Sequence, residues 1–199
     1  MSWFARPIVV ATATAILLAI SSCAPYSGSA RPIDPATVSG PGWLGPVGVP
    51  LVRQQRHADC GAAAMAMVAS FWNGPISEQE VLAITPHSRR GIRAGDLRVA
   101  ARTLGLRAFV VEGTFADLRH ELGNGRPVVV GLVKPMGDQT RNHYEVVVGI
   151  NEAKRTIATL DPAAGWRQNS YQAFALEWAR SGRVTVVVLP TTRVSSREG

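Results

Sequence analysis

The feature that most restricts the fold of this chain is the order in which two kinds of segment follow one another. Helix-forming runs ended by glycine dominate residues 60–122, whereas short β-branched runs bounded by turn residues dominate residues 127–189. This order predicts an α+β fold in which N-terminal helices pack on a C-terminal, largely antiparallel sheet. The expected helices are 60–72, 77–84, 95–104, 114–122 and 171–180, and the expected strands are 107–112, 127–133, 144–150, 156–160 and 184–189.

Two helix starts carry residues that are typical of caps. Asp59 stands directly before the first expected helix, where its carboxylate could accept a free backbone N–H. Ser77 is followed three residues later by Glu80, which is the spacing of a capping box. Both positions therefore predict where a helix begins.

The N-terminus predicts export. The apolar run over residues 8–20 is shorter than the ~20 residues that cross a bilayer, and it fits the apolar region of an export signal. Ser21, Ser22 and Cys23 follow it and resemble the lipobox of bacterial lipoproteins, in which the cysteine is acylated and becomes the new N-terminus. We interpret residues 1–22 as a lipoprotein signal peptide and Cys23 as the lipidation site. An ordinary signal peptide and a short membrane anchor are the alternatives.

The next segment is expected to be a tether. Residues 23–50 hold six of the 13 prolines, and such a stretch buries little surface and stays extended. It would hold a folded domain, residues 51–190, a few nanometres from a membrane, and a polar tail follows over residues 191–199. Ala24 rather than Asp follows the lipobox cysteine, which resembles lipoproteins sent to the outer membrane, so we expect an exported protein on its periplasmic face.

Charge and cysteine content exclude two classes of partner. The net charge is +7, but the basic residues are scattered and the longest run is Arg89-Arg90, so no nucleic-acid-binding stripe is evident. The two cysteines form no CxxC pair and are too few for a four-cysteine zinc site. We therefore expect no nucleic acid and no metal.

Cys60 is the residue whose position most needs an explanation. A buried helical cysteine is most often a small apolar side chain of the core. Cys60, however, stands in the first turn of its helix, where free N–H groups and the positive end of the helix dipole stabilise a thiolate. If Cys23 carries lipid, Cys60 has no disulfide partner, and an unpaired thiol in an oxidising envelope is either inert in the core or used as a nucleophile.

A nucleophilic cysteine needs a base, and the base needs an orienting group. His57, His87 and His120 lie in polar surroundings, whereas His143 opens an apolar strand that we place at the edge of the sheet. If strands 144–150 and 156–160 form a hairpin, Asp161 lies at the same end of it as His143. A carboxylate there could hold one imidazole nitrogen while the other faces a thiol, although an aspartate before proline is also an ordinary turn residue.

In this order the residues resemble the bacteriocin-processing peptidases, the papain-like cysteine peptidases that cleave double-glycine leaders. The resemblance covers residues 52–189 and implies a papain-like fold. The matching residues are Gln54, Asp59-Cys60-Gly61 with the Ala/Met-rich helix that follows, the segment 91–106, His143-Tyr144, Asp161-Pro162, Gly165, Phe174 and Trp178.

The resemblance also implies site roles. Cys60 would be the nucleophile, His143 the general base and then acid, and Asp161 the group that orients His143. Gln54 would donate its side-chain amide to the oxyanion together with the backbone N–H of Cys60; the neighbouring Gln55 is the alternative. No cofactor or metal is implied, and the partner would be a peptide or protein substrate.

One feature departs from the family pattern. Many of these peptidases are fused to a transporter, and this chain has no ATP-binding motif. It looks like a stand-alone, exported lipoprotein member whose substrate need not be a leader peptide. A catalytically inactive peptide-binding module of the same fold, and a cysteine-dependent amidase or acyltransferase, are the alternatives to a cysteine peptidase of the cell envelope.

Overall fold

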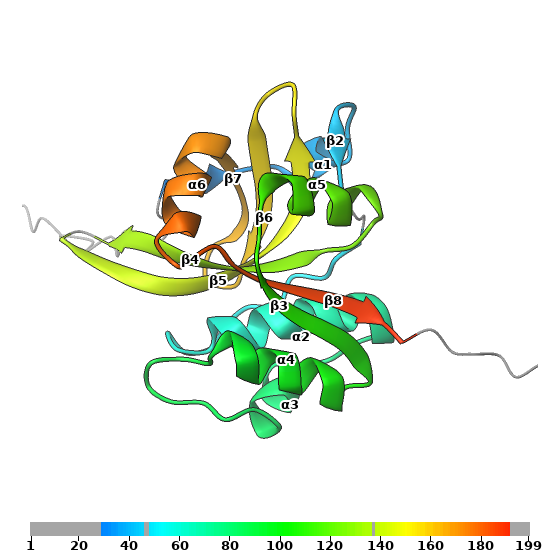
Figure 1. Ribbon diagram of the computed structural model, residues 1–199, viewed down its shortest axis with the longest axis vertical. Helices are drawn as coiled ribbons and strands as arrows, with labels where there is room; N and C mark the ends of the chain where they lie inside the picture. The colour runs from blue at the N-terminus through cyan, green and yellow to red at the C-terminus, as the bar shows by residue number, and fades with distance from the viewer. Residues whose placement is uncertain (1–28, 46–47, 137, 192–199) are drawn as a thin grey trace, which may run out of the picture.

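The computed structural model describes residues 29–45, 48–136 and 138–191. The predicted signal peptide, Cys23 and residues 192–199 lie outside these ranges. The described residues form one eight-stranded, entirely antiparallel sheet with helices on both faces (Figure 1). None of their helices is long and apolar enough to span a bilayer.

The centre of the sheet is a long hairpin of β4 (Val128–Met136) and β5 (Gln139–Asn151). The strand order is β1-β7-β6-β5-β4-β8-β3, and β2 pairs separately with β5. The remaining strands are β1 (Arg31–Pro32), β2 (Trp43–Leu44), β3 (Leu106–Glu112), β6 (Thr156–Asp161), β7 (Gly165–Ser170) and β8 (Val184–Pro190).

The helices divide between the two faces of the sheet, and so does the core. One core contains α2 (Cys60–Asn73) and α4 (Ala94–Thr103) against strand residues such as Val129, and the other contains α5 (Phe115–Gly123) and α6 (Tyr171–Ala179) against Val128 and Val130. Successive side chains of β4 thus alternate between the faces, because the side-chain period of a strand is two. The short helices α1 (Pro35–Val38) and α3 (Glu78–Ala83) complete the fold.

The expected α+β architecture is confirmed: helices pack on a C-terminal antiparallel sheet. The Ser77–Glu80 capping box is also confirmed, since each side chain accepts the other residue's backbone N–H. The expected Asp59 cap is wrong. The Asp59 backbone is not extended and its side chain makes no cap hydrogen bond, so only its carbonyl, which accepts from Ala63, begins the helix.

Two details of the sheet differ from expectation. β7 was not expected, because its sequence Gly-Trp-Arg-Gln-Asn-Ser lacks the β-branched residues typical of strands. His143 does not open a strand at a sheet edge, but lies inside β5, which is flanked by β4 and β6. The polar residues 139–142 pair with β4 and extend the strand beyond its apolar part.

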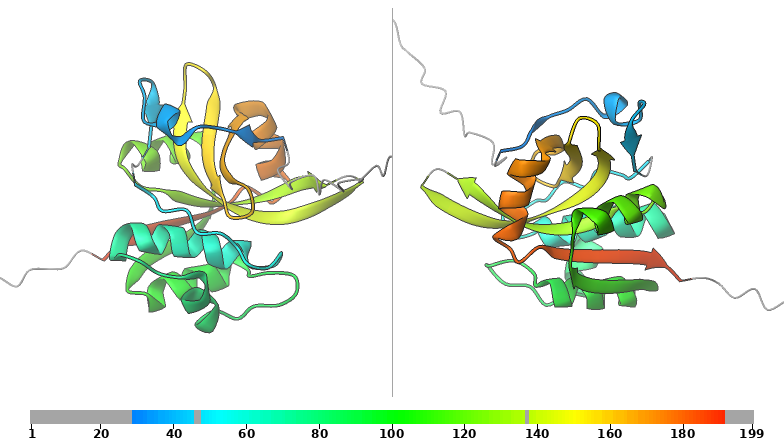
Figure 2. Two further views of the ribbon diagram at one scale, coloured as in Figure 1. Left: turned by 180° about the vertical axis from the view of Figure 1, so that it is seen from behind. Right: turned by 45° about the horizontal axis from the view of Figure 1, so that its top comes forward.

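The tether prediction is wrong for residues 29–45, which pack on the domain. β1 pairs with β7, β2 pairs with β5, and Figure 2 shows this segment, in blue, lying beside β7 and the β5–β6 hairpin. The backbone N–H and hydroxyl of Ser29 donate to Glu177 of α6 at 2.8 and 2.7 Å, and Trp43 packs against the core. Long-range pairing and one aromatic side chain thus fold a stretch whose prolines suggested an extended chain.

Candidate active site

Cys60 lies at the N-terminus of α2, at a groove of about 670 Å³. The thiol side chain is mostly buried, with 6% of the residue exposed. The groove is walled by the loop before α4, by β4 and β5, and by the turn between α6 and β8. A peptide could therefore reach Cys60 between the helical layer and the sheet.

The Cys60 thiol is hydrogen-bonded to the imidazole of His143. Burial raises the pKa of the thiol, but the hydrogen bond and the positive charge of His143, with the backbone N–H groups of Tyr144 and Gly61, outweigh burial. The pKa of Cys60 is therefore below its ordinary value. Gly61 also lets Tyr144 approach, since a Cβ at position 61 would lie 3.2 Å from the Tyr144 ring.

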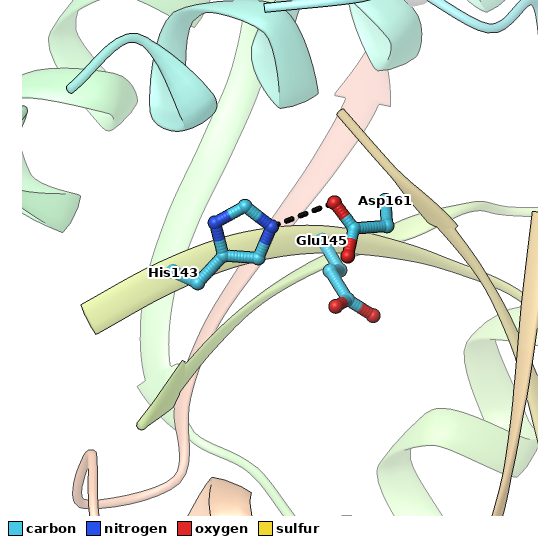
Figure 3. Close-up of side chains that lie close together, drawn as sticks. All are labelled: His143, Glu145 and Asp161. Carbon is cyan, nitrogen blue, oxygen red and sulfur yellow. Dashed lines mark hydrogen bonds and ion pairs between the residues drawn. The ribbon is translucent and has the colours of Figure 1, made fainter. Parts of the chain in front are cut away.

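Asp161 holds the other side of the His143 ring. Its Oδ1 lies 2.8 Å from Nε2 of His143 (Figure 3) and also accepts the backbone N–H of Ala163 at 2.8 Å and of Ala164 at 3.2 Å. Burial raises the pKa of Asp161, but the hydrogen bond and charge of His143 outweigh it, so the carboxyl pKa lies well below its usual range. Because Asp161 binds Nε2, Nδ1 is the nitrogen left for the thiol.

The charges of the three groups favour one protonation state. Burial lowers the pKa of His143, but the hydrogen bonds to Asp161 and Cys60 outweigh burial, so its pKa is raised. A lowered thiol pKa beside a raised imidazole pKa favours transfer of the proton from Cys60 to His143. The geometry thus favours a thiolate–imidazolium pair with a carboxylate behind it.

This pair predicts how the thiol reacts as the pH changes. An ordinary thiol, with a pKa of ~8.5, loses about tenfold in alkylation rate for each pH unit below that value. We expect His143 to hold Cys60 as a thiolate over this range, so its iodoacetamide alkylation rate should change by less than about threefold between pH 8 and pH 6. Stopped-flow or mass-spectrometric alkylation rates check this expectation, with free cysteine as the reference. A tenfold loss per pH unit would contradict it.

The two glutamines considered for the oxyanion hole, Gln54 and Gln55, do not line the groove. The backbone N–H of Gln54 donates to Pro162 at 3.1 Å, so Gln54 adjoins the turn after Asp161. Its side-chain amide donates to the carbonyl of Arg56 at 2.9 Å, and it does not line the groove. Gln55 is exposed. Neither glutamine is seen in contact with Cys60, and the oxyanion role of Gln54 stays a prediction.

Of the four histidines only His143 is buried, and His57, His87 and His120 are exposed, as their polar surroundings predicted. Two other buried residues of the site were missed. Nζ of Lys134 contacts a carboxylate oxygen of Glu145 and lies 3.1 Å from Oδ2 of Asp161. No signal in the sequence marks these two residues. Both stand in strands, where a charged side chain is ordinarily exposed on the face that points to solvent.

Among the described residues, one group of side chains has ligand atoms close enough together to hold a metal ion. It consists of His143, Glu145 and Asp161, whose ligand atoms lie within 4.8 Å of one another. The Lys134 ammonium lies against both carboxylates. It supplies the positive charge that a cation would bring, and the donor set therefore fits an internal charge network better than a metal site.

Comparison with known proteins identifies the family of this chain. The family model of the Peptidase C39 family matches residues 48–191. The comparison with curated proteins gives no match.

Solved structures of the same kind share the fold. The peptidase domain of Streptococcus ComA, a bi-functional ABC transporter, is 24% identical, with 72% of this chain and 100% of that chain covered and a TM-score of 0.61. A double glycine motif protease from an AMS/PCAT transporter, in complex with its leader peptide, is 25% identical, with 74% and 95% covered and a TM-score of 0.58. A C39-like peptidase from Bacillus anthracis is 15% identical, with 75% and 98% covered and a TM-score of 0.63. The resemblance to double-glycine leader peptidases is thus confirmed, and the chain belongs to the Peptidase C39 family of cysteine peptidases.

Proposed function

We propose that this cysteine peptidase uses Cys60 as nucleophile, His143 as general base and acid, and Asp161 to orient His143. The observation that carries the proposal is the unbroken contact from thiol to imidazole to carboxylate at one groove. The thiolate attacks a peptide carbonyl, and the imidazolium then gives its proton to the leaving amine. Water, activated by neutral His143, hydrolyses the acyl-enzyme and releases the thiolate.

The oxyanion of each tetrahedral intermediate needs hydrogen-bond donors. We assign this role to the backbone N–H of Cys60 and to the side-chain amide of Gln54, which has one N–H besides the one bound to the Arg56 carbonyl. Loss of one such donor lowers kcat by roughly 10²–10³-fold. Gln54→Ala should show a loss of this size while Gln55→Ala should not.

The proposed substrate is a peptide cut after two glycines. The family relationship supports this, and the related transporter protease at 25% identity is bound to a leader peptide.

A pair of synthetic peptides tests the substrate. We expect cleavage of a peptide with a central Gly-Gly, and at least tenfold slower cleavage of the same peptide with Leu-Leu in its place. Equal rates on both would refute the glycine preference but not the peptidase. Hydrolysis of simple amides or wall fragments in preference to either peptide would instead indicate an amidase, and no turnover of any of these would favour a binding module.

We also propose that the protein works in the cell envelope, exported by residues 1–22 and anchored by lipid on Cys23 to the periplasmic face of the outer membrane. The sequence pattern of residues 8–24 supports this proposal. Several acyl chains on one cysteine give stable anchoring, whereas one chain binds only reversibly.

Cys23→Ser should move the protein from the membrane fraction to the soluble fraction, because the acylated sulfur is lost. Cell fractionation followed by immunoblotting measures this. Cys60→Ser is the matched control, since it removes the other cysteine and should leave the protein with the membranes. A Cys23→Ser protein that still sediments with membranes would contradict the lipid anchor.

A further inference from the structure

Three charged side chains meet in the interior behind His143. Lys134 of β4 and Asp161 of β6 are fully buried, and Glu145 of β5 is 1% exposed. Nζ of Lys134 contacts Glu145 and lies 3.1 Å from Oδ2 of Asp161. Figure 3 shows the two carboxylates on neighbouring strands close to the His143 ring. The adjacent strands β4, β5 and β6 thus place one ammonium between two carboxylates.

The two oxygens of Asp161 have separate partners. Oδ1 accepts from His143 and from the backbone N–H groups of Ala163 and Ala164, and Oδ2 accepts from Lys134. Rotation of the carboxylate would break contacts on both oxygens at once. Lys134, together with these two backbone N–H groups, therefore fixes which oxygen faces the imidazole.

The ammonium also sets the charge of Asp161. Two buried carboxylates at this separation cannot both stay ionised without a cation, because like charges raise the pKa of one of them. Burial lowers the pKa of Lys134 and the contact with Asp161 opposes that shift. With Lys134 charged, both Asp161 and Glu145 can remain anions.

Stability alone does not account for these groups. A buried ion pair is seldom more stabilising than apolar side chains of the same volume, since desolvation offsets the attraction. Apolar side chains in place of Lys134 and Glu145 could not keep Asp161 ionised and oriented toward His143.

We propose that Lys134, with Glu145 as its counter-ion, is a positioning pair that keeps Asp161 ionised and oriented toward His143. The proposal rests on the proposed pairing of His143 with Cys60. Lys134 touches no substrate and acts only through Asp161. Other charges near Lys134 come from Arg167 of β7 and Glu177 of α6, and they remain unchanged in every variant below.

The first test is Lys134→Met, compared with Lys154→Met. Lys154 is the only other lysine and is exposed in the β5–β6 turn, so its loss should change nothing. In Lys134→Met the cation between Asp161 and Glu145 is lost, and a proton shared by the two carboxylates weakens the anionic partner of the imidazolium. The proton then moves back toward the thiol, and iodoacetamide alkylation of Cys60 at pH 7 should slow by about tenfold, which corresponds to one pKa unit.

The pH profile of kcat/KM gives a readout that a merely structural role would not move. Asp161 raises the pKa of His143, so loss of its charge lets the imidazolium release its proton at lower pH. The alkaline limb of the profile should therefore shift to lower pH in Lys134→Met. Both measurements are made below the melting temperature of each variant, as determined by circular dichroism.

The double variant Lys134→Met/Glu145→Met separates positioning from simple neutralisation of Glu145, and it keeps the proposal testable if Lys134→Met does not fold. This variant removes the repulsion between Asp161 and Glu145, but Oδ2 of Asp161 still lacks its partner. We therefore expect the alkylation rate of Cys60 to be at least threefold below that of the wild type. The proposal would be overturned if either variant kept the alkylation rate of the wild type and showed no shift in the alkaline limb of the kcat/KM profile. Alkylation needs no substrate, so an unreactive Cys60 in the wild type would refute the proposed function instead.

Discussion

Cys60→Ala is expected to reduce peptide hydrolysis to background while the protein remains folded. Loss of a triad nucleophile lowers kcat by roughly 10⁶-fold, because the covalent route disappears and only binding and oxyanion stabilisation remain. Removal of one sulfur atom from a mostly buried side chain costs about 1 kcal/mol of folding free energy. The melting temperature should therefore change by only a few degrees.

The measurement is the rate of cleavage of the Gly-Gly peptide, with the melting temperature taken on the same preparations. Cys60→Ser is the informative partner variant, since it keeps the side-chain size but replaces the thiolate by a hydroxyl that His143 must deprotonate. We expect it to be as inactive as Cys60→Ala. Substantial turnover by Cys60→Ala would exclude Cys60 as nucleophile.

His143→Ala should be nearly as inactive, because triad residues act as a unit. The thiol should also lose its unusual reactivity. Burial raises the pKa of Cys60, and His143 supplies the main opposing interactions. Without the imidazole the pKa of Cys60 rises, so alkylation at pH 7 should fall by more than about tenfold, one pKa unit being a factor of ten.

His87→Ala is the matched control for this variant. His87 also lines the groove, but it is exposed and its Nδ1 contacts the carbonyl of Thr85. Its removal should leave alkylation unchanged and hydrolysis within a few fold of wild type. If His87→Ala were inactive and His143→Ala active, the base would have been misassigned.

The pairing of His143 with Asp161 could be predicted because it depends on local topology. Two adjacent strands joined by a short turn form a hairpin, and residues at its open end must lie close together. The structure has this hairpin as β5 and β6, and His143 and Asp161 are in contact. The helix start at Cys60 was predictable from the Ala/Met-rich run that follows it, although Asp59 does not cap the helix with its side chain.

Lys134 and Glu145 could not be predicted, because their burial is a tertiary effect. A lysine beside a turn and a glutamate at an alternate position of a strand are ordinary exposed residues when only the sequence is considered. The packing of α6 over the sheet helps to bury both. The two-residue strands β1 and β2 were missed because they are too short to show a periodic pattern.

If lipid on Cys23 anchors the enzyme, as proposed, the contact of Ser29 with Glu177 limits how far from the membrane it could act. In a protein acylated at Cys23, six residues would join the lipid to a point fixed on the domain. At up to about 3.5 Å per residue, that chain spans no more than ~20 Å, which is less than the usual diameter of a folded domain of this length. The groove could then sample only a thin layer of solvent above the bilayer. Substrates would be selected by their presence at the membrane surface as well as by their sequence.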